Sequence, residues 1–219
     1  GVIIYNQLNF IQNKNLGFSK EEVLVIPMKN EHMDRRMEAI KIELSGVKGV
    51  ASVSASSNMP GGQFNQNSIA LVEAPDEDIA TSEVLVDYDF QKTMSLELLE
   101  GRFFTVDDRP SETEMKFVIN ETAARQLSNT SVVGKEINWY AYENDRPIIG
   151  RVVGVVKDFH FQSLHDPLRP LLMIPYPAYN HLIVKLNTEN FEQSLAAVKN
   201  VFHQFENSFE FEFAFLDDR

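Results

Sequence analysis

Apolar side chains near the start of the chain follow two different periods. Residues 22–28 form a short run rich in β-branched side chains, which is typical of a strand. The next apolar side chains recur at helical steps on one face: Met33, Met37, Ile40 and Leu44. We expect Asn30 to cap the start of this helix and Gly46 to end it in a left-handed conformation. Residues 50–57 alternate small and apolar side chains, so a β-α-β unit is predicted here.

The end of the chain repeats this order. Residues 182–186 form an apolar run, and residues 191–205 carry an apolar stripe at helical spacing. Phenylalanine then occupies every second position from Phe209 to Phe215, which predicts a strand with one buried and one exposed face. Two β-α-β units at opposite ends of a chain can share one layer. We therefore predict an α+β fold that is closed by both ends of the chain.

The middle of the chain is richer in predicted strands. Four strands and one short helix are predicted there, at residues 67–72, 83–86, 115–119, 148–156 and 88–94. A further helix follows Asn120, whose side chain is suited to cap it. The turn at residues 60–62 and the acidic loop at residues 73–78 are expected at exposed tips. This part is predicted to be an inserted β-rich subdomain, followed by a strand at residues 171–174.

The first residues are apolar, and the polar segment after them is predicted to continue as a helix over residues 1–18. The chain begins without methionine, so we expect this opening to be the continuation of a longer segment. No run of about 18 apolar residues occurs in the sequence, so no membrane span is expected within it.

Charge and composition narrow the class of protein. Lys and Arg total 20 against 32 Asp and Glu, which gives a net charge of −12. Nucleic acids and anionic lipid surfaces attract clustered Lys and Arg, so we expect no nucleic-acid partner. The chain contains no cysteine, which excludes disulfides, thiolate nucleophiles and cysteine-ligated metals. Hydrophobic residues make up 43% and charged residues 24%, as in ordinary globular domains.

Sequence motifs that carry catalysis are absent. There is no Gly-x-Ser-x-Gly elbow, no phosphate-binding Gly-x-x-x-x-Gly-Lys and no dinucleotide-binding Gly-x-Gly-x-x-Gly. The paired acids at 107–108 and 217–218 are expected in solvated turns. We therefore predict no catalytic residue and no cofactor.

Two histidines leave a metal site open as an alternative. His160 and His165 lie close together in the sequence, with Asp158 and Asp166 beside them. A spacing of five residues suits neither one face of a helix nor one face of a strand, and no third ligand is defined. We favour hydrogen bonds from these groups to backbone at a strand end, and predict no metal.

Three segments carry a resemblance to a known family. They are Glu-Gly-Arg-Phe-Phe at 100–104, Val-Ile-Asn-Glu-Thr-Ala-Ala-Arg-Gln-Leu at 118–127 and the stretch that begins Gly-Arg-Val-Val-Gly-Val-Val-Lys-Asp-Phe-His at 150–172. With them, the chain from about residue 5 to 217 resembles the extracytoplasmic core domain of MacB/FtsX-type ABC transporter permeases. Structural roles are predicted for Gly101, Arg102, Phe103, Asn120, Glu121, Gly154, Asp158, Phe159 and His160. Gly101 would turn the chain, and Arg102 would be available to a carboxylate.

The resemblance implies an architecture. Residues 1–18 would lead from a transmembrane helix as a helical stub. Residues 19–87 and 168–219 would form a porter-like subdomain built from a split β-α-β arrangement. Residues 88–167 would form the inserted β-rich subdomain.

The resemblance also implies a function and partners. The chain would be a non-catalytic periplasmic domain of an inner-membrane permease, coupled through transmembrane helices to a cytoplasmic ATPase subunit. A homodimer, a periplasmic adaptor and an outer-membrane duct would be compatible with it. Both ends of the domain would then have to leave from one side.

Two other classes of function stay open. A freestanding periplasmic ligand-binding or sensor module predicts an apolar pocket, for which Trp139, Tyr140 and Tyr142 would be natural wall residues. A metal-dependent hydrolase would have to use His160 and His165.

Overall fold

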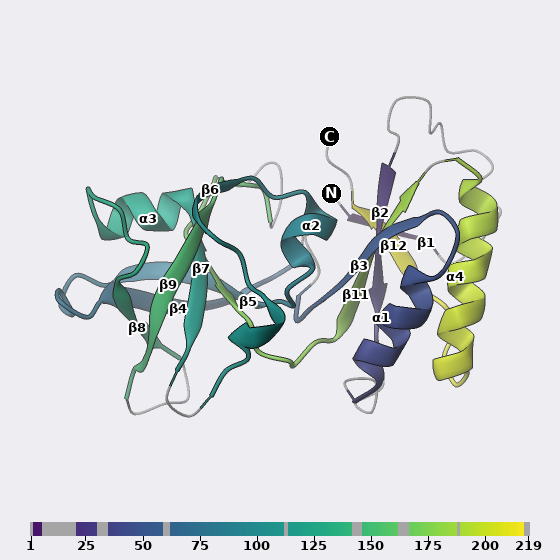
Figure 1. The fold of residues 1–219 in the computed structure, drawn as a ribbon, viewed down its shortest axis with the longest axis horizontal. Helices are drawn as coiled ribbons and strands as arrows, with labels where there is room; N and C mark the ends of the chain where they lie inside the picture. The colour runs from purple at the N-terminus through teal and green to yellow at the C-terminus, as the bar shows by residue number, and fades with distance from the viewer. Residues whose placement is uncertain are drawn as a thin grey trace.

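The computed structural model describes residues 2–5, 21–29, 35–58, 62–111, 114–141, 146–161, 167–187 and 189–216. The chain folds as an α+β protein with two sheets that lie side by side (Figure 1). Within the described residues, no helix is both long and apolar enough to cross a bilayer.

The first sheet has five strands and draws on both ends of the chain. In spatial order they are β1 (Val2–Tyr5), β12 (Phe213–Leu216), β2 (Glu21–Pro27), β11 (His181–Asn187) and β3 (Val50–Ser56). All neighbours are antiparallel. Helix α1 (Met37–Ser45) joins β2 to β3, and α4 (Phe191–Phe205) joins β11 to β12. Each helix therefore connects two parallel strands that have another strand between them, which is a split β-α-β connection.

Both helices cover one face of this sheet (Figure 1). Their buried side chains, such as Ile40 and Val198, pack against Leu24, Val53 and Val184 of the strands. The apolar stripes read from the sequence are thus the inner faces of two amphipathic helices.

The second sheet has seven strands and closes on itself. In order they are β6 (Leu98–Gly101), β9 (Ile148–Val156), β7 (Lys116–Asn120), β10 (Leu171–Ile174), β5 (Ile79–Leu85), β4 (Asn65–Leu71) and β8 (Glu136–Tyr140). Strand β8 also pairs with the first half of β9, whereas β6 pairs with its second half. The long β9 therefore closes a barrel of the strands β9, β7, β10, β5, β4 and β8.

Strands β7 and β10 are buried on both faces. Leu172 and Ile174 belong to the core inside the barrel, whereas Leu171 and Met173 belong to a second core outside it. Helix α3 (Glu121–Leu127) covers one end of the barrel, because its Ala123 joins the inner core. Such strands read as continuous apolar runs rather than alternating ones.

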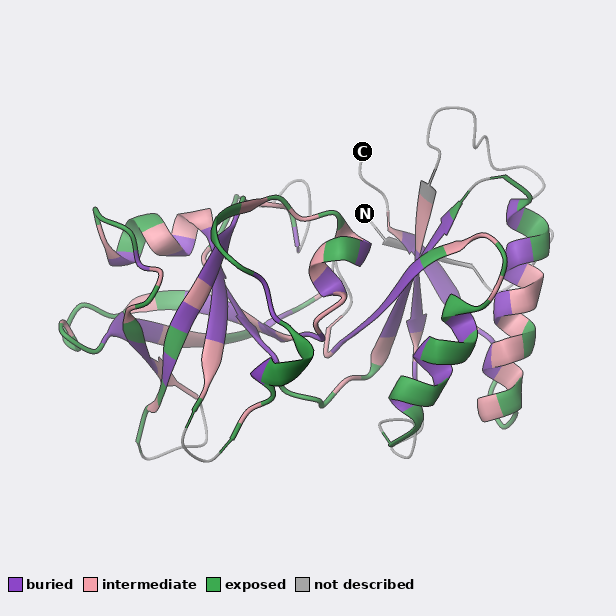
Figure 2. Cartoon of the chain, in the orientation of Figure 1, coloured by how far each residue is buried: buried purple, intermediate pink, exposed green. Residues whose placement is uncertain are grey.

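The outer core is shared between the two sheets. It contains Val84 and Val118 of the barrel, Phe90 of the short helix α2 (Phe90–Met94) and Ile183 of the five-stranded sheet. Figure 2 shows buried positions in both sheets and exposed ones on the outer sides of the helices. A common apolar core makes the two parts pack as one body.

Several predicted elements are confirmed, among them strands β2, β9, β10 and β11 and helices α3 and α4. The predicted N-terminal helix is wrong where it can be checked, because Val2–Tyr5 forms strand β1; residues 6–18 lie outside the described part. A β-branched apolar run gains more from pairing with an open sheet edge than from a helix.

The ends of two other elements also differ from expectation. Helix α1 begins at Met37, and Asn30 and Met33 lie outside the described residues. Gly46 has a φ of −79°, and the left-handed glycine of this turn is Gly49, at +94°. The last strand begins only at Phe213, and Phe209 is largely exposed. Strands β6 and β8 had no prediction.

Strand pairing also bears on the predicted subdomains. The proposed boundaries at 88 and 168 place β4, β5 and β10 with the five-stranded sheet, whereas their hydrogen bonds join them to the barrel. Strand pairing over long sequence distances decides this, and local pattern does not report it. The division into two subdomains stays a proposal, and we propose to move the bounds of the inserted one from 88–167 to about 62–175, so that it includes all the barrel strands.

Candidate functional site

The two ends of the described chain lie side by side. Strands β1 and β12 pair antiparallel, and Val2 stands opposite Leu216. Figure 1 shows β1 and β12 as neighbours in the five-stranded sheet. The described ends therefore lie together, which agrees with the expectation that both ends leave one side of the domain.

The family-like segments meet around two glycines. Gly101 of β6 stands opposite Gly154 of β9, so segments 100–104 and 150–172 face each other. A Cβ on Gly154 would lie 2.0 Å from the carbonyl oxygen of Arg102, and one on Gly101 would lie 2.2 Å from that of Val153. Gly101 also has a positive φ of 69°. Only glycine permits this close approach and backbone turn.

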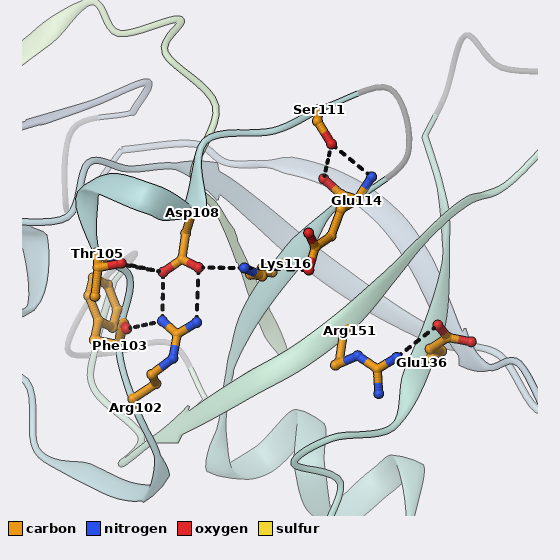
Figure 3. A network of polar contacts seen from close by, with 9 residues as sticks. All are labelled: Arg102, Phe103, Thr105, Asp108, Ser111, Glu114, Lys116, Glu136 and Arg151. Carbon is orange, nitrogen blue, oxygen red and sulfur yellow. Dashed lines mark hydrogen bonds and ion pairs between the residues drawn. The ribbon is translucent and has the colours of Figure 1, made fainter.

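Arg102 then reaches a buried carboxylate. Its guanidinium binds Asp108 in a bidentate pair, with N–O distances of 2.6 and 2.9 Å (Figure 3). Lys116 lies 3.0 Å from the same carboxylate, and Thr105 donates to it from its backbone N–H at 2.7 Å. The side chain of Asp108 is 1% exposed. The hydrogen bonds from Arg102, followed by those from Thr105 and Lys116, hold the pKa of Asp108 well below its usual range, against the effect of burial.

This burial corrects one expectation. The pair at 107–108 was predicted in a solvated turn, but only Asp107 is exposed. Asp108 is buried because a forked guanidinium and an ammonium compensate its charge. Phe103 beside it is buried in the outer core.

The second and third segments meet at the start of α3. Asn120 is fully buried and caps the helix by accepting from the N–H of Ala123 at 3.1 Å, and its side chain also accepts from the N–H of Leu171 of β10 at 2.9 Å. Asp158, which follows β9, accepts from the N–H of Thr122 at 2.9 Å and from its hydroxyl at 2.6 Å. The carboxylate and the amide satisfy N–H groups that a helix start leaves open. Glu121 lies 3.1 Å from Arg125 on the surface of the same helix.

The residues proposed for the metal alternative are only partly described. Phe159 packs against Phe161 at the border of the outer core, with 5.8 Å between ring centroids, and His160 is exposed. His165 and Asp166 lie outside the described residues. Among the residues that are described, no group of three metal-ligating side chains comes together.

A second charged cluster, which sequence reasoning missed, joins the two sheets. Lys41 of α1 lies 2.6 Å from Asp87 and 2.7 Å from Asp89, both in the segment that leads from β5 to α2. Asp87 also accepts from the hydroxyl of Ser54 at 2.7 Å and from the N–H of Ala55 at 3.1 Å, on β3. We call these residues the junction cluster. It ties the barrel's exit segment to a helix and a strand of the five-stranded sheet.

Burial shapes the electrostatics of the junction cluster. The side chains of Lys41 and Asp87 are 6% and 3% exposed. Burial lowers the pKa of Lys41, but the carboxylates of Asp87 and Asp89 more than reverse this and raise the pKa above its ordinary value. Burial raises the pKa of Asp87, although Lys41 and Ser54 oppose the rise.

One signal in the sequence could have revealed this cluster. Lys41 stands four residues after Met37 and three before Leu44, so it interrupts the apolar stripe of α1. A lysine at such a position must be paired or reach the surface. Its partner could not be identified from the sequence, because Asp87 lies 46 residues further along the chain.

An apolar cavity lies at the barrel end that α3 does not cover. It is lined by Ser57, Asn65, Glu83, Leu85, Met115, Trp139, Ile148, Ile174 and Tyr176 and has a volume of about 330 Å³. Trp139 is therefore a wall residue of this cavity. Tyr140 does not line the cavity, and Tyr142 lies outside the described part of the chain.

This architecture is similar to that of solved extracytoplasmic domains of transporter permeases. The periplasmic region of MacB from Actinobacillus actinomycetemcomitans superposes with a TM-score of 0.61 at 18% identity, over 89% of this chain and 88% of that one. The extracellular domain of the noncanonic ABC-type transporter YknZ from Gram-positive bacteria gives 0.55 at 17%, over 90% and 98%. A domain of a Porphyromonas gingivalis permease protein gives 0.58 at 15%, over 91% of each chain.

The sequence itself gives the family. The model of the MacB-like periplasmic core domain matches residues 4–201, and the chain belongs to this family. No curated protein matches the chain. The resemblance stated from the three segments is thereby confirmed, and the chain is a periplasmic domain of a MacB-like ABC transporter permease, a class that works with a cytoplasmic ATPase.

Proposed function

We propose that this domain is a stiff, non-catalytic coupling element. It transmits the movement of transmembrane helices, driven by the cytoplasmic ATPase, to a partner or substrate outside the membrane. The observation that carries the proposal is the pairing of β1 with β12, which brings both chain ends to one place on the domain. Two transmembrane helices that move relative to each other would act directly on this pair of strands, β1 and β12, which we call the root.

The packing between the two sheets also supports a coupling role. A displacement at the root reaches the far side only if the parts between do not yield. The outer core is shared by both sheets, and the junction cluster fixes the segment between them with charged hydrogen bonds. Lys185 of β11 adds a bond to the hydroxyl of Ser95 at 2.6 Å, which fixes the end of α2 to the five-stranded sheet. A homodimer, an adaptor and an outer-membrane duct stay predictions from the family.

The test makes the connection between the paired chain ends and the membrane flexible, and leaves the two sheets unchanged. In the full-length permease, assembled with its ATPase in nanodiscs, a flexible Gly-Ser segment of about eight residues is inserted after Leu216. A donor fluorophore on Glu97→Cys transfers energy to acceptor-labelled lipid headgroups. The efficiency of this transfer reports the distance between the labelled part of the domain and the membrane surface. We expect ATP to change the energy transfer in the uninterrupted protein, and the insertion to remove most of this change while ATP hydrolysis continues.

The same insertion after Asp76, in the exposed acidic loop, is the matched control. Loop insertions of this length cost little stability. It should leave the ATP-dependent change intact. The proposal is wrong if the signal ignores ATP in the uninterrupted protein, or if the insertion after Leu216 leaves it unaltered.

A further inference from the structure

The cavity at the barrel mouth is lined by the ends of barrel strands. Met115 precedes the start of β7 and Ile148 begins β9, whereas α3 follows the other end of β7. The ring of Phe117 in the barrel core lies edge-on to Trp139, with 6.1 Å between centroids. A Cβ on Gly150 would lie 2.5 Å from the Phe117 ring, so this glycine leaves room for that ring. Barrel mouths are among the places where small ligands bind.

Most of the wall is apolar, and one carboxylate interrupts it. Glu83 of β5 lies in this wall and is half-buried. Its Oε2 accepts from the amide of Asn67 at 2.6 Å and from the indole N–H of Trp139 at 2.8 Å. Its Oε1 accepts only a long bond of 3.5 Å from Asn65 among the bonds seen in the described residues. The Glu83 carboxylate is thus held in place, and its Oε1 can accept a further hydrogen bond.

The groups that hold Glu83 carry no charge. Two amides and an indole orient the carboxylate but leave its negative charge uncompensated. In the described part of the chain no Lys, Arg or His forms an ion pair with Glu83, in contrast to Asp87 and Asp108. A fixed carboxylate among apolar walls favours a cation, and the aromatic rings of Trp139 and Tyr176 in the wall can add a cation–π attraction.

We propose that the barrel mouth binds a small organic cation, with an apolar body in the cavity and one ammonium group on Glu83. The volume of about 330 Å³ lies at the lower end of small-molecule sites. In Figure 1 the starts of β7 and β9 lie on the lower side of the molecule, at the opposite end of the barrel from α3. This site goes beyond the coupling role and does not depend on it.

The chain supplies its own reporter, because Trp139 is its only tryptophan. The 219-residue chain is titrated with n-octylammonium, n-octanol and n-octanoate, which share one apolar body and differ in the head group. We expect saturable changes in the Trp139 emission, with n-octylammonium binding at least tenfold more tightly than n-octanoate. Calorimetry of the same titrations gives an independent affinity.

Two variants locate the charge. Glu83→Gln keeps the shape and should reduce the preference for ammonium over carboxylate to near unity. Glu97→Gln makes the same change at an exposed position outside the cavity and should keep the preference. Thermal melting and circular dichroism establish that both variants are folded. Equal affinity for the three head groups, no saturable binding, or an unchanged preference in folded Glu83→Gln would each overturn the proposal.

Discussion

Asp87 and Asp108 are both buried carboxylates, yet their surroundings differ. Asp108 lies at the surface side of the barrel, where the side chain of Arg102 is 47% exposed and that of Lys116 22% exposed. Asp87 lies between the two sheets, where its cation Lys41 is 6% exposed. In the Arg102 cluster only the charge of Asp108 is removed from water. In the junction cluster the charges of both Asp87 and Lys41 are removed from water.

The pKa directions follow from this difference. Partners that remain partly hydrated lower the pKa of Asp108, whereas burial raises the pKa of Asp87 in spite of Lys41. A buried ion pair gains little net stability, but removing one partner leaves an uncompensated charge. We infer that the junction cluster fixes the relative position of the two sheets, while the Arg102 cluster stabilises a local turn.

The largest effect is expected at the junction. Lys41→Met leaves Asp87 buried without its cation and should lower the free energy of unfolding by about 3–5 kcal/mol. Urea denaturation of the 219-residue chain measures the loss. Adding Asp87→Asn to this variant removes the stranded charge and should recover part of it. A loss below about 1 kcal/mol in Lys41→Met would contradict the comparison.

A smaller loss is expected at the Arg102 cluster. Asp108→Asn removes a charged acceptor of hydrogen bonds, but Arg102 and Lys116 can turn to water. We expect a loss of about 2 kcal/mol, as for hydrogen bonds to charged groups. The same urea series measures it. A larger loss here than in Lys41→Met would reverse the ranking of the two clusters.

Lowering the pH should change the contributions of Asp108 and Asp87 to stability in opposite directions. The pKa of Asp108 is lower in the folded chain than the ordinary value of about 3.9, so its contribution is present above that value and is lost as the pH falls below it. Asp108→Asn should therefore flatten the acid loss of stability. The raised pKa of Asp87 acts in the opposite direction, so Asp87→Asn should steepen the loss. Unfolding free energies between pH 6 and about 3 test both slopes.

The smallest effect serves as the reference for exposed pairs. Lys157 and Glu97 lie 3.4 Å apart with side chains 59% and 63% exposed. Lys157→Met should change the free energy of unfolding by less than about 0.5 kcal/mol. A loss as large as that of Lys41→Met would show that burial does not set the ranking.

Local pattern predicted those elements whose own side chains determine them. The stripe of α4 and the cap of α3 at Asn120 are readable because helix spacing and N-cap chemistry act within a few residues. The membership of β4, β5 and β10 in the barrel is not readable, since it depends on hydrogen bonds between segments far apart in the chain. Closure by β9 depends on two different partners along one strand, which no period reports.

The contacts of the charged residues were likewise predictable only where the local sequence determines them. Arg102 was expected to have a carboxylate partner, yet nothing in an adjacent acidic pair tells which acid is buried. Glu83 gave no signal at all, because its neighbours Asn67 and Trp139 meet it only when three strands pair.

The pairing of Val2 with Leu216 places the two described ends at neighbouring strand positions, about 5 Å apart in backbone terms. A unit with such ends can be spliced into a surface hairpin of an unrelated host with short joints on both sides. It can equally be given new ends elsewhere by joining the old ones, so its gene is well suited to circular permutation.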